Sequence, residues 1–274
     1  MKLRIITSIV ALPLLLLVLI VLPPFFTSLL LMAACAVAVY ELLWNTGYVR
    51  QGRLLVETML AAVGTALWSY LGSPHGWGVA GILLFSSVLF GEMLISKAKL
   101  PFSKVSLCFV GGLLIPYLLC SIVRIRMMEL GSVYVLLPFL LAFMSDTCAY
   151  FTGRFLGRHK LAPNISPKKT VEGMFGGMAG AVFGMMIYCL VLMLAFDQRV
   201  DFLFAIVYGV LGSLASVLGD LTFSVIKRQT GIKDYGKIIP GHGGVLDRFD
   251  SITVVAPLAE ALLIILPIAE SIHG

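Results

Sequence analysis

Long apolar runs separated by short polar breaks are the feature that most constrains how this chain can fold. Several runs reach 18 residues or more, and only 12% of the 274 residues are charged. A helix needs about 20 consecutive apolar residues to cross the hydrocarbon core of a bilayer. The runs do not alternate in the short segments of a membrane β-barrel, so helices are the remaining way to satisfy the backbone in lipid. We therefore predict an all-α, polytopic integral membrane protein.

The hydropathy pattern predicts about nine transmembrane helices. The first apolar run follows Lys2 and Arg4 without a small-residue cleavage site, so we expect a retained helix and not a signal peptide. The predicted spans cover roughly residues 5–22, 25–45, 54–71, 77–96, 103–123, 132–152, 171–196, 202–226 and 251–269.

Lysine and arginine are distributed unevenly across these spans. If the N-terminus is cytoplasmic, 17 of the 20 basic residues lie on the cytoplasmic side, and only Arg124, Arg126 and Arg199 lie opposite. This positive-inside bias predicts a cytoplasmic N-terminus and puts the two longest polar loops, near 153–170 and 227–250, on the cytoplasmic face. The net charge of +6 therefore reflects membrane orientation, and we expect no nucleic-acid partner.

The stretch from Ser224 to Asp250 is a dense polar segment between two apolar runs. The positive-inside rule accounts for its basic residues but not for the run Gly241-His242-Gly243-Gly244. Glycines allow backbone N–H groups to approach phosphate oxygens, although the pattern is not a Walker A loop. His242 fits three roles equally: binding phosphate, acting as an acid, or facing water.

Three aspartates in this region are candidate metal ligands. Asp220 lies late in the eighth span, where the helix dipole disfavours an anion, and it shares a helix face with Ser224 and Lys227. Asp247 and Asp250 share a face where the ninth span begins, a position that favours anions in any case. Carboxylates suit Mg²⁺, which is usually held by one or two of them plus substrate phosphates. A salt bridge from Asp220 to Lys227 or another basic residue is the competing interpretation.

The polar loop before the seventh span adds further candidates. Ser166 followed by Pro167 is typical of a helix N-cap with proline at the first position, which places Lys168 and Lys169 in the first helical turn. Lysines there oppose the helix dipole, and a bound phosphate would account for them. Asp146, inside the sixth span, is either a further metal ligand or the partner of a lysine.

Both loops together resemble the phosphatidate cytidylyltransferase family, also called CDP-diacylglycerol synthases. The family pattern Ser-x-x-Lys-Arg, Lys-Asp and Pro-x-His-Gly-Gly-x-x-Asp-Arg-x-Asp is met in full between Ser224 and Asp250. The segment Ser166–Gly173 and Asp146 are similar to that family as well. The resemblance implies transfer of a cytidylyl group from CTP to phosphatidic acid, in a magnesium-dependent inner-membrane homodimer. It further implies that Asp220 and Asp247 bind metal, with Asp250 in the same cluster and K⁺ as a possible second metal.

These inferences give one working hypothesis. Residues 1–130 embed the protein and form dimer contacts, and residues 131–274 carry the catalytic helices. Catalysis is assigned to Asp220, Asp247, Lys227 and Lys169, and metal binding to Asp220, Asp247, Asp250 and Asp146. The residues expected to hold CTP and its phosphates are Ser166, Lys168, Lys169, Lys227, Arg228, Lys233, His242, Gly243, Gly244 and Arg248.

Two other classes stay open at this point. A different lipid-phosphate enzyme, such as a lipid kinase or a phospho-sugar transferase, would handle metal and phosphate in the same way. A transporter or channel would line a pathway with acids, usually with broken helices near the midplane and repeat symmetry. The polar residues here crowd one face of the membrane, which disfavours transport.

Overall fold

The computed structural model describes residues 9, 11–72, 75–97, 99–238 and 243–271, and His242 lies outside them. In this part of the chain, seven helices are long and apolar enough to cross a membrane. They are Pro24–Asn45, Gly52–Leu71, Gly76–Ile95, Phe102–Arg126, Gly131–Phe155, Val171–Phe196 and Phe202–Gln229. The predicted all-α membrane fold is thus confirmed. The first and last predicted spans correspond to shorter apolar helices at Ala11–Val21 and Ile252–Ile265, so the count of nine stays a prediction.

The chain divides into two compact units. The N-terminal unit comprises Met1–Val135 together with Lys227–Phe249, and the C-terminal unit comprises Leu136–Ile226 together with Asp250–Gly274. The polar loop after the eighth span therefore belongs with the N-terminal helices. The predicted division near residue 130 did not place Lys227–Phe249 with the N-terminal helices. The roles predicted for the two parts, membrane embedding and catalysis, stay predictions.

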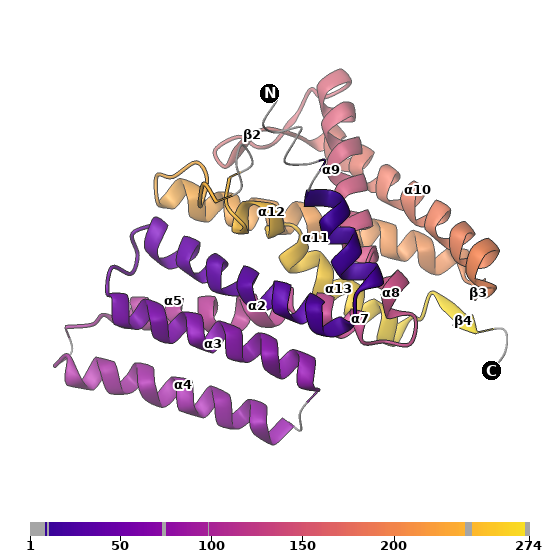
Figure 1. The fold of residues 1–274 in the computed structure, drawn as a ribbon. Coiled ribbons are helices and arrows are strands. Elements are labelled where there is room, and N and C mark those ends of the chain that lie inside the picture. Colours follow the sequence, from indigo (N-terminus) through magenta and orange to yellow (C-terminus); the bar gives the residue numbers. More distant parts are fainter. Residues whose placement is uncertain (1–8, 10, 73–74, 98, 239–242, 272–274) are drawn as a thin grey trace. The chain divides into compact units, whose positions relative to one another are not determined.

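The N-terminal unit is built from consecutive helices, of which α2, α3 and α4 appear side by side in Figure 1. Its core is formed by fully buried side chains such as Leu42, Ala62, Cys108 and Ile122. A π-helical turn continues α2, and a second interrupts the fourth long helix. The elements are η1 (Leu17–Val21), α2 (Pro24–Tyr40), η2 (Glu41–Asn45), α3 (Gly52–Leu71), α4 (His75–Ile95), α5 (Phe102–Phe109), η3 (Val110–Leu114), α6 (Ile115–Leu119), α7 (Ser121–Arg126), α8 (Gly131–Tyr134) and α12 (Leu246–Phe249).

The C-terminal unit contains the longest helices and two small antiparallel sheets. Its elements are α9 (Leu137–Phe155), β1 (Lys160–Ala162), β2 (Ser166–Thr170), α10 (Val171–Phe196), β3 (Gln198–Val200), α11 (Phe202–Gln229), α13 (Ile252–Ile265) and β4 (Ala269–Ser271). The last three residues of α11, from Lys227 onward, are counted with the N-terminal unit. Strand β1 pairs with β2, and β3 pairs with β4.

Helices α9 and α10 pack along a row of glycines. A Cβ atom at Gly177 would lie 2.8 Å from the Ser145 carbonyl oxygen, and one at Gly173 would lie 2.8 Å from the Ala149 carbonyl oxygen. Such small residues allow close backbone approach in membranes, where apolar side chains gain little by leaving lipid. The glycines at positions 173 and 177 are therefore packing residues. This close packing fixes the position of α9, which carries Asp146, along α10.

The start of α10 corrects one prediction. Ser166 is not an N-cap, because Ser166–Thr170 form strand β2 and the helix begins at Val171. The cap is Thr170, whose hydroxyl accepts a hydrogen bond from the Gly173 N–H at 3.1 Å. The physical reason is Pro167, which biases the preceding residue toward extended backbone and fits an edge strand. Lys168 and Lys169 consequently precede the helix, so the argument that they oppose its dipole no longer holds.

A break also separates the two aspartates that were expected to share a helix face. Asp247 lies in the short helix α12, Asp250 lies in the turn after it, and α13 starts at Ile252. Asp250 accepts a hydrogen bond from the Ser251 N–H at 2.8 Å. The chain at this point passes from the N-terminal unit to the C-terminal unit, so the two carboxylates have different neighbours.

We predict that Gly177→Val destabilises the protein by roughly 1–3 kcal/mol, because the new side chain overlaps the backbone of α9. The measurement is thermal unfolding of the purified protein in detergent. The matched control is Gly64→Val, since a Cβ at Gly64 has no heavy atom within 4 Å. Equal unfolding temperatures for the two variants would contradict the close packing of α9 and α10.

Candidate functional site

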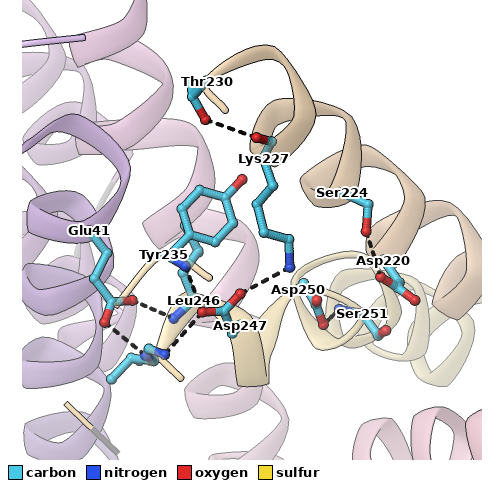
Figure 2. A network of polar contacts seen from close by, with 12 residues as sticks. Glu41, Asp220, Ser224, Lys227, Thr230, Tyr235, Leu246, Asp247, Asp250 and Ser251 are labelled. Atoms are coloured by element: carbon cyan, nitrogen blue, oxygen red, sulfur yellow. Dashed lines mark hydrogen bonds and ion pairs between the residues drawn. The ribbon is translucent and has the colours of Figure 1, made fainter. Parts of the chain in front are cut away.

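Asp247 holds the polar loop of the N-terminal unit together. Its Oδ1 accepts a hydrogen bond from Lys227 Nζ at 2.9 Å, and its Oδ2 accepts from the backbone N–H groups of Tyr235 at 2.7 Å and Gly244 at 3.0 Å (Figure 2). Its side chain is only 4% exposed. One carboxylate therefore connects the end of α11, the middle of the loop and the glycine turn.

The aromatic ring of Tyr235 completes this arrangement. The tyrosine is 1% exposed, and Lys227 Nζ lies 5.4 Å from its ring centroid, close enough for a cation–π interaction. Gly243 next to the turn has a φ of +87°, a conformation that side chains rarely adopt, and a Cβ there would meet the Asp247 carboxylate. Lys227, Asp247, Gly243 and Gly244 thus belong to one connected group of contacts.

Glu41 is a site residue that sequence reasoning missed. Its carboxylate is fully buried and accepts hydrogen bonds from the N–H groups of Val245 at 3.0 Å and Leu246 at 2.8 Å (Figure 2). Asn45, one turn further, donates to the Tyr235 carbonyl oxygen at 2.7 Å. A glutamate within a long apolar run was the available signal, since intramembrane acids are rarely without a role.

The C-terminal unit contains a second and more open polar cluster. Asp220 on α11 forms an ion pair with Lys169 on β2, with Nζ and Oδ2 2.5 Å apart and side-chain exposures of 28% and 22%. Ser224 donates to Asp220 Oδ1 at 3.1 Å, which confirms the shared helix face of these two residues (Figure 2). The competing interpretation of Asp220 as a salt-bridge partner is confirmed for Lys169, and Lys227 pairs with Asp247 instead.

Asp146 belongs to the same cluster. Its exposed side chain accepts a hydrogen bond from the buried Ser216 hydroxyl at 3.4 Å, and it lies within electrostatic reach of both Lys169 and Asp220. Two acidic side chains here lie near one lysine, so the acidic groups outnumber the basic ones among the three residues named. Carboxylate oxygens are ligands that a hard cation prefers.

Asp250 approaches this cluster through its backbone. A Cβ at Gly219, next to Asp220, would lie 2.7 Å from the Asp250 carbonyl oxygen and 2.9 Å from the Ser251 Cα. The absence of a side chain at Gly219 therefore lets the start of α13 pack directly on α11. The C-terminal unit thus brings together Asp146, Lys169 and Asp220, with the Asp250 backbone beside them.

The other predicted phosphate-binding residues are divided between the two units. Ser166 is half-buried on strand β2, and Lys168 beside it is exposed. Arg228, Lys233 and Arg248 are exposed in the N-terminal unit. All three side chains are exposed, and their roles in phosphate binding stay predictions.

The residues of the two clusters fit a divalent cation to different degrees. Asp146 and Asp220 offer carboxylate oxygens that are partly exposed, the hard ligands that Mg²⁺ takes together with substrate phosphates. Asp247 already accepts three hydrogen bonds of the roughly four that a carboxylate can accept, so it has room for a single metal contact. Among the residues that the structure describes, no three His, Cys, Asp or Glu side chains form a ready-made metal site.

The fold and these clusters define a polytopic helical membrane protein with carboxylate and lysine groups suited to phosphate and a hard cation. Residues 2–266 match the Cytidylyltransferase family. The chain is 33% identical to phosphatidate cytidylyltransferase of Staphylococcus saprophyticus over 274 residues, which covers 96% of this chain and 99% of that protein. It is 33% identical over 268 residues to the protein of the same name from Staphylococcus aureus, with the same coverage. The chain therefore belongs to the cytidylyltransferase family, as the sequence motifs predicted.

We predict that Asp247→Asn destabilises the protein on the order of 3 kcal/mol, because it leaves the largely buried Lys227 without its charge partner. Asp220→Asn should cost less, because the side chains of the Lys169–Asp220 pair are more exposed than those of the Lys227–Asp247 pair, although the Lys169 Nζ atom is itself buried. Thermal unfolding of both variants in detergent, without substrates, measures the difference. Equal losses would contradict the distinction between a closed and an open cluster.

Proposed function

We propose that this protein transfers the cytidylyl group of CTP to phosphatidic acid, giving CDP-diacylglycerol and pyrophosphate. The family match over residues 2–266 and the shared name of its relatives support this reaction. The structural observation that carries it is the Lys169–Asp220 ion pair beside a second carboxylate, in which the two side chains are partly exposed although the Lys169 Nζ atom itself is buried. A phosphate would attract the lysine, and a metal ion would attract the aspartates.

In the proposed reaction, an oxygen of the lipid phosphate forms a bond to the α-phosphorus of CTP. The bond from this phosphorus to the bridging oxygen breaks, and pyrophosphate leaves with the electron pair. The protein needs no covalent nucleophile, because positioning and charge neutralisation dominate such phosphoryl transfers. The two lipid chains remain in the bilayer throughout.

The basic residues of this chain would bind and orient the phosphates. Lys168 and Lys169 lie on strand β2, directly before α10. Lys169 forms the ion pair with Asp220, and Lys168 is its neighbour in the sequence. Exposed Arg228, Lys233 and Arg248 would neutralise further phosphate charge. Lysines act as point charges and arginines can bind two oxygens at once, so the chemistry of both groups of cations suits phosphate.

A divalent cation is the cofactor that we propose for this site. Asp220 and Asp146 would hold it, with Asp247 and Asp250 as the ligands implied by the family motif. When bound, Mg²⁺ would neutralise charge on the reacting phosphates, and K⁺ is proposed as an assisting second ion. A cytoplasmic site in a bacterial inner membrane and a homodimer complete the proposal, supported by the positive-inside bias and the motif resemblance.

The decisive experiment is pyrophosphate release by the purified protein with phosphatidic acid and one nucleotide at a time. We expect release with CTP and Mg²⁺, and none with ATP or a UDP-sugar. Formation of labelled CDP-diacylglycerol from labelled CTP identifies the product. Phosphorylation of a lipid by ATP would instead indicate a lipid kinase, and nucleotide-independent flux in liposomes would indicate a transporter. Either result without CTP turnover would refute the proposal.

We predict that Asp220→Asn lowers the turnover number at least 100-fold, because it removes a charge from the proposed metal and phosphate site. The unfolding temperature should stay close to that of the wild type, since the lost ion pair is partly exposed. Initial rates over a range of Mg²⁺ concentrations provide the measurement. The control is Glu92→Gln, which removes a carboxylate paired with the exposed Arg53. Wild-type turnover of Asp220→Asn at limiting Mg²⁺ would exclude Asp220 as a metal ligand.

A further inference from the structure

Glu41 is a buried carboxylate whose partners lie more than 200 positions away in the sequence. It accepts hydrogen bonds from the N–H groups of Val245 and Leu246 and has no exposed surface. Among the residues that the structure describes, no lysine, arginine or histidine forms an ion pair with it. A charge is unfavourable in such a place unless hydrogen bonds satisfy it, so the contacts to the loop are what stabilise this residue.

The loop is shaped to receive this side chain. A Cβ at Gly244 would have three atoms of the Glu41 carboxyl group as its three nearest neighbours, at or below about 2.5 Å. A Cβ at Gly236 would overlap the same carboxylate. Both glycines are buried, and neither has a positive φ. Their lack of a side chain is therefore required by the approach of Glu41 and not by the backbone conformation.

Two carboxylates from segments far apart in the sequence thus accept hydrogen bonds from the loop backbone. Glu41 binds the N–H groups of Val245 and Leu246, while Asp247 binds those of Tyr235 and Gly244. Figure 2 shows the two side chains pointing at this same short stretch of backbone. The geometry of Asp247, and with it the position of its partner Lys227, therefore depends on Glu41.

The local structure of the helix supports a role beyond packing. Glu41–Asn45 form the π-helical turn η2, and the two ends of this turn, Glu41 and Asn45, both bind the loop. Such turns are rare and occur frequently at functional sites, because the wider turn redirects side chains. Here it aims two polar groups of an apolar helix at one loop.

We propose that Glu41 is a positioning residue for the transfer reaction, which fixes the Gly243-Gly244 end of the polar loop and thereby sets the Lys227–Asp247 pair. This role rests on the proposed function for its catalytic consequence. The anchoring of the loop itself does not depend on which substrate is used. It also gives the N-terminal helices a part in the chemistry, although the family motifs lie in the C-terminal half of the sequence.

The test combines hydrogen exchange with kinetics on the full-length protein in detergent. Glu41→Gln should speed exchange of the amides in residues 244–247 at least 10-fold and leave the amides of α3 unchanged. Its turnover number should fall at least 10-fold with a smaller change in the KM for CTP, because the binding cations remain. The matched control, Glu57→Gln, removes a carboxylate that pairs with Arg53 away from the loop, and should change neither measurement.

A double-mutant cycle separates positioning from a general loss of structure. Gly244→Ala alone should lower the turnover number, because the new methyl group overlaps the Glu41 carboxylate. In a Glu41→Ala background the same substitution should have little further effect, since the overlapping group is gone. Additive effects would overturn the proposal, as would unchanged exchange in Glu41→Gln or faster exchange throughout the protein. A wild-type protein inactive with CTP would refute the proposed function, while the exchange result would still decide the role of Glu41.

Discussion

An irregular stretch of backbone next to membrane helices needs hydrogen-bond acceptors for its N–H groups, and two carboxylates provide them here. Glu41 and Asp247 together accept four backbone hydrogen bonds from residues 235–246. A buried backbone N–H group without an acceptor costs free energy, so irregular backbone packed inside a protein needs such partners. The loop can therefore combine glycines and charges in a fixed conformation because acids replace the missing secondary structure.

This constraint explains why the two polar clusters differ in character. In the N-terminal unit, Asp247 is 4% exposed and its oxygens are largely occupied, so its charge serves to hold the loop. In the C-terminal unit, Asp220 and Lys169 are partly exposed, and Asp146 adds a carboxylate that no second lysine among the described residues neutralises. A buried network such as that of Asp247 resists rearrangement. In a more exposed ion pair such as Lys169–Asp220, each side chain can instead bind a ligand. This contrast supports the proposal that the first cluster mainly holds the loop and that the second mainly binds the ligand.

The sequence predicted the membrane helices well because hydropathy depends on composition over long windows, which a few substitutions hardly change. It also predicted that Asp220 and Ser224 share a face, because helical periodicity is local. It failed at Ser166, where a serine and proline match both a helix N-cap and a short strand, and the pairing of β2 with β1 decided the outcome. The reach of Lys169 to Asp220 depends on that pairing, and no local pattern contains it.

Glu41 illustrates the other limit of sequence reasoning. A single acid near the end of an apolar run can be an interfacial residue, a helix-end residue or a buried anchor, and its neighbours in the sequence do not distinguish these. What identifies it is the absence of side chains at Gly236 and Gly244, roughly 200 residues later. Once the backbone of the loop is fixed, these glycines and the carboxylate are complementary in both shape and charge. The motif that defines the family is thus only part of the structure that positions it, because one of its supports comes from the apolar half of the chain.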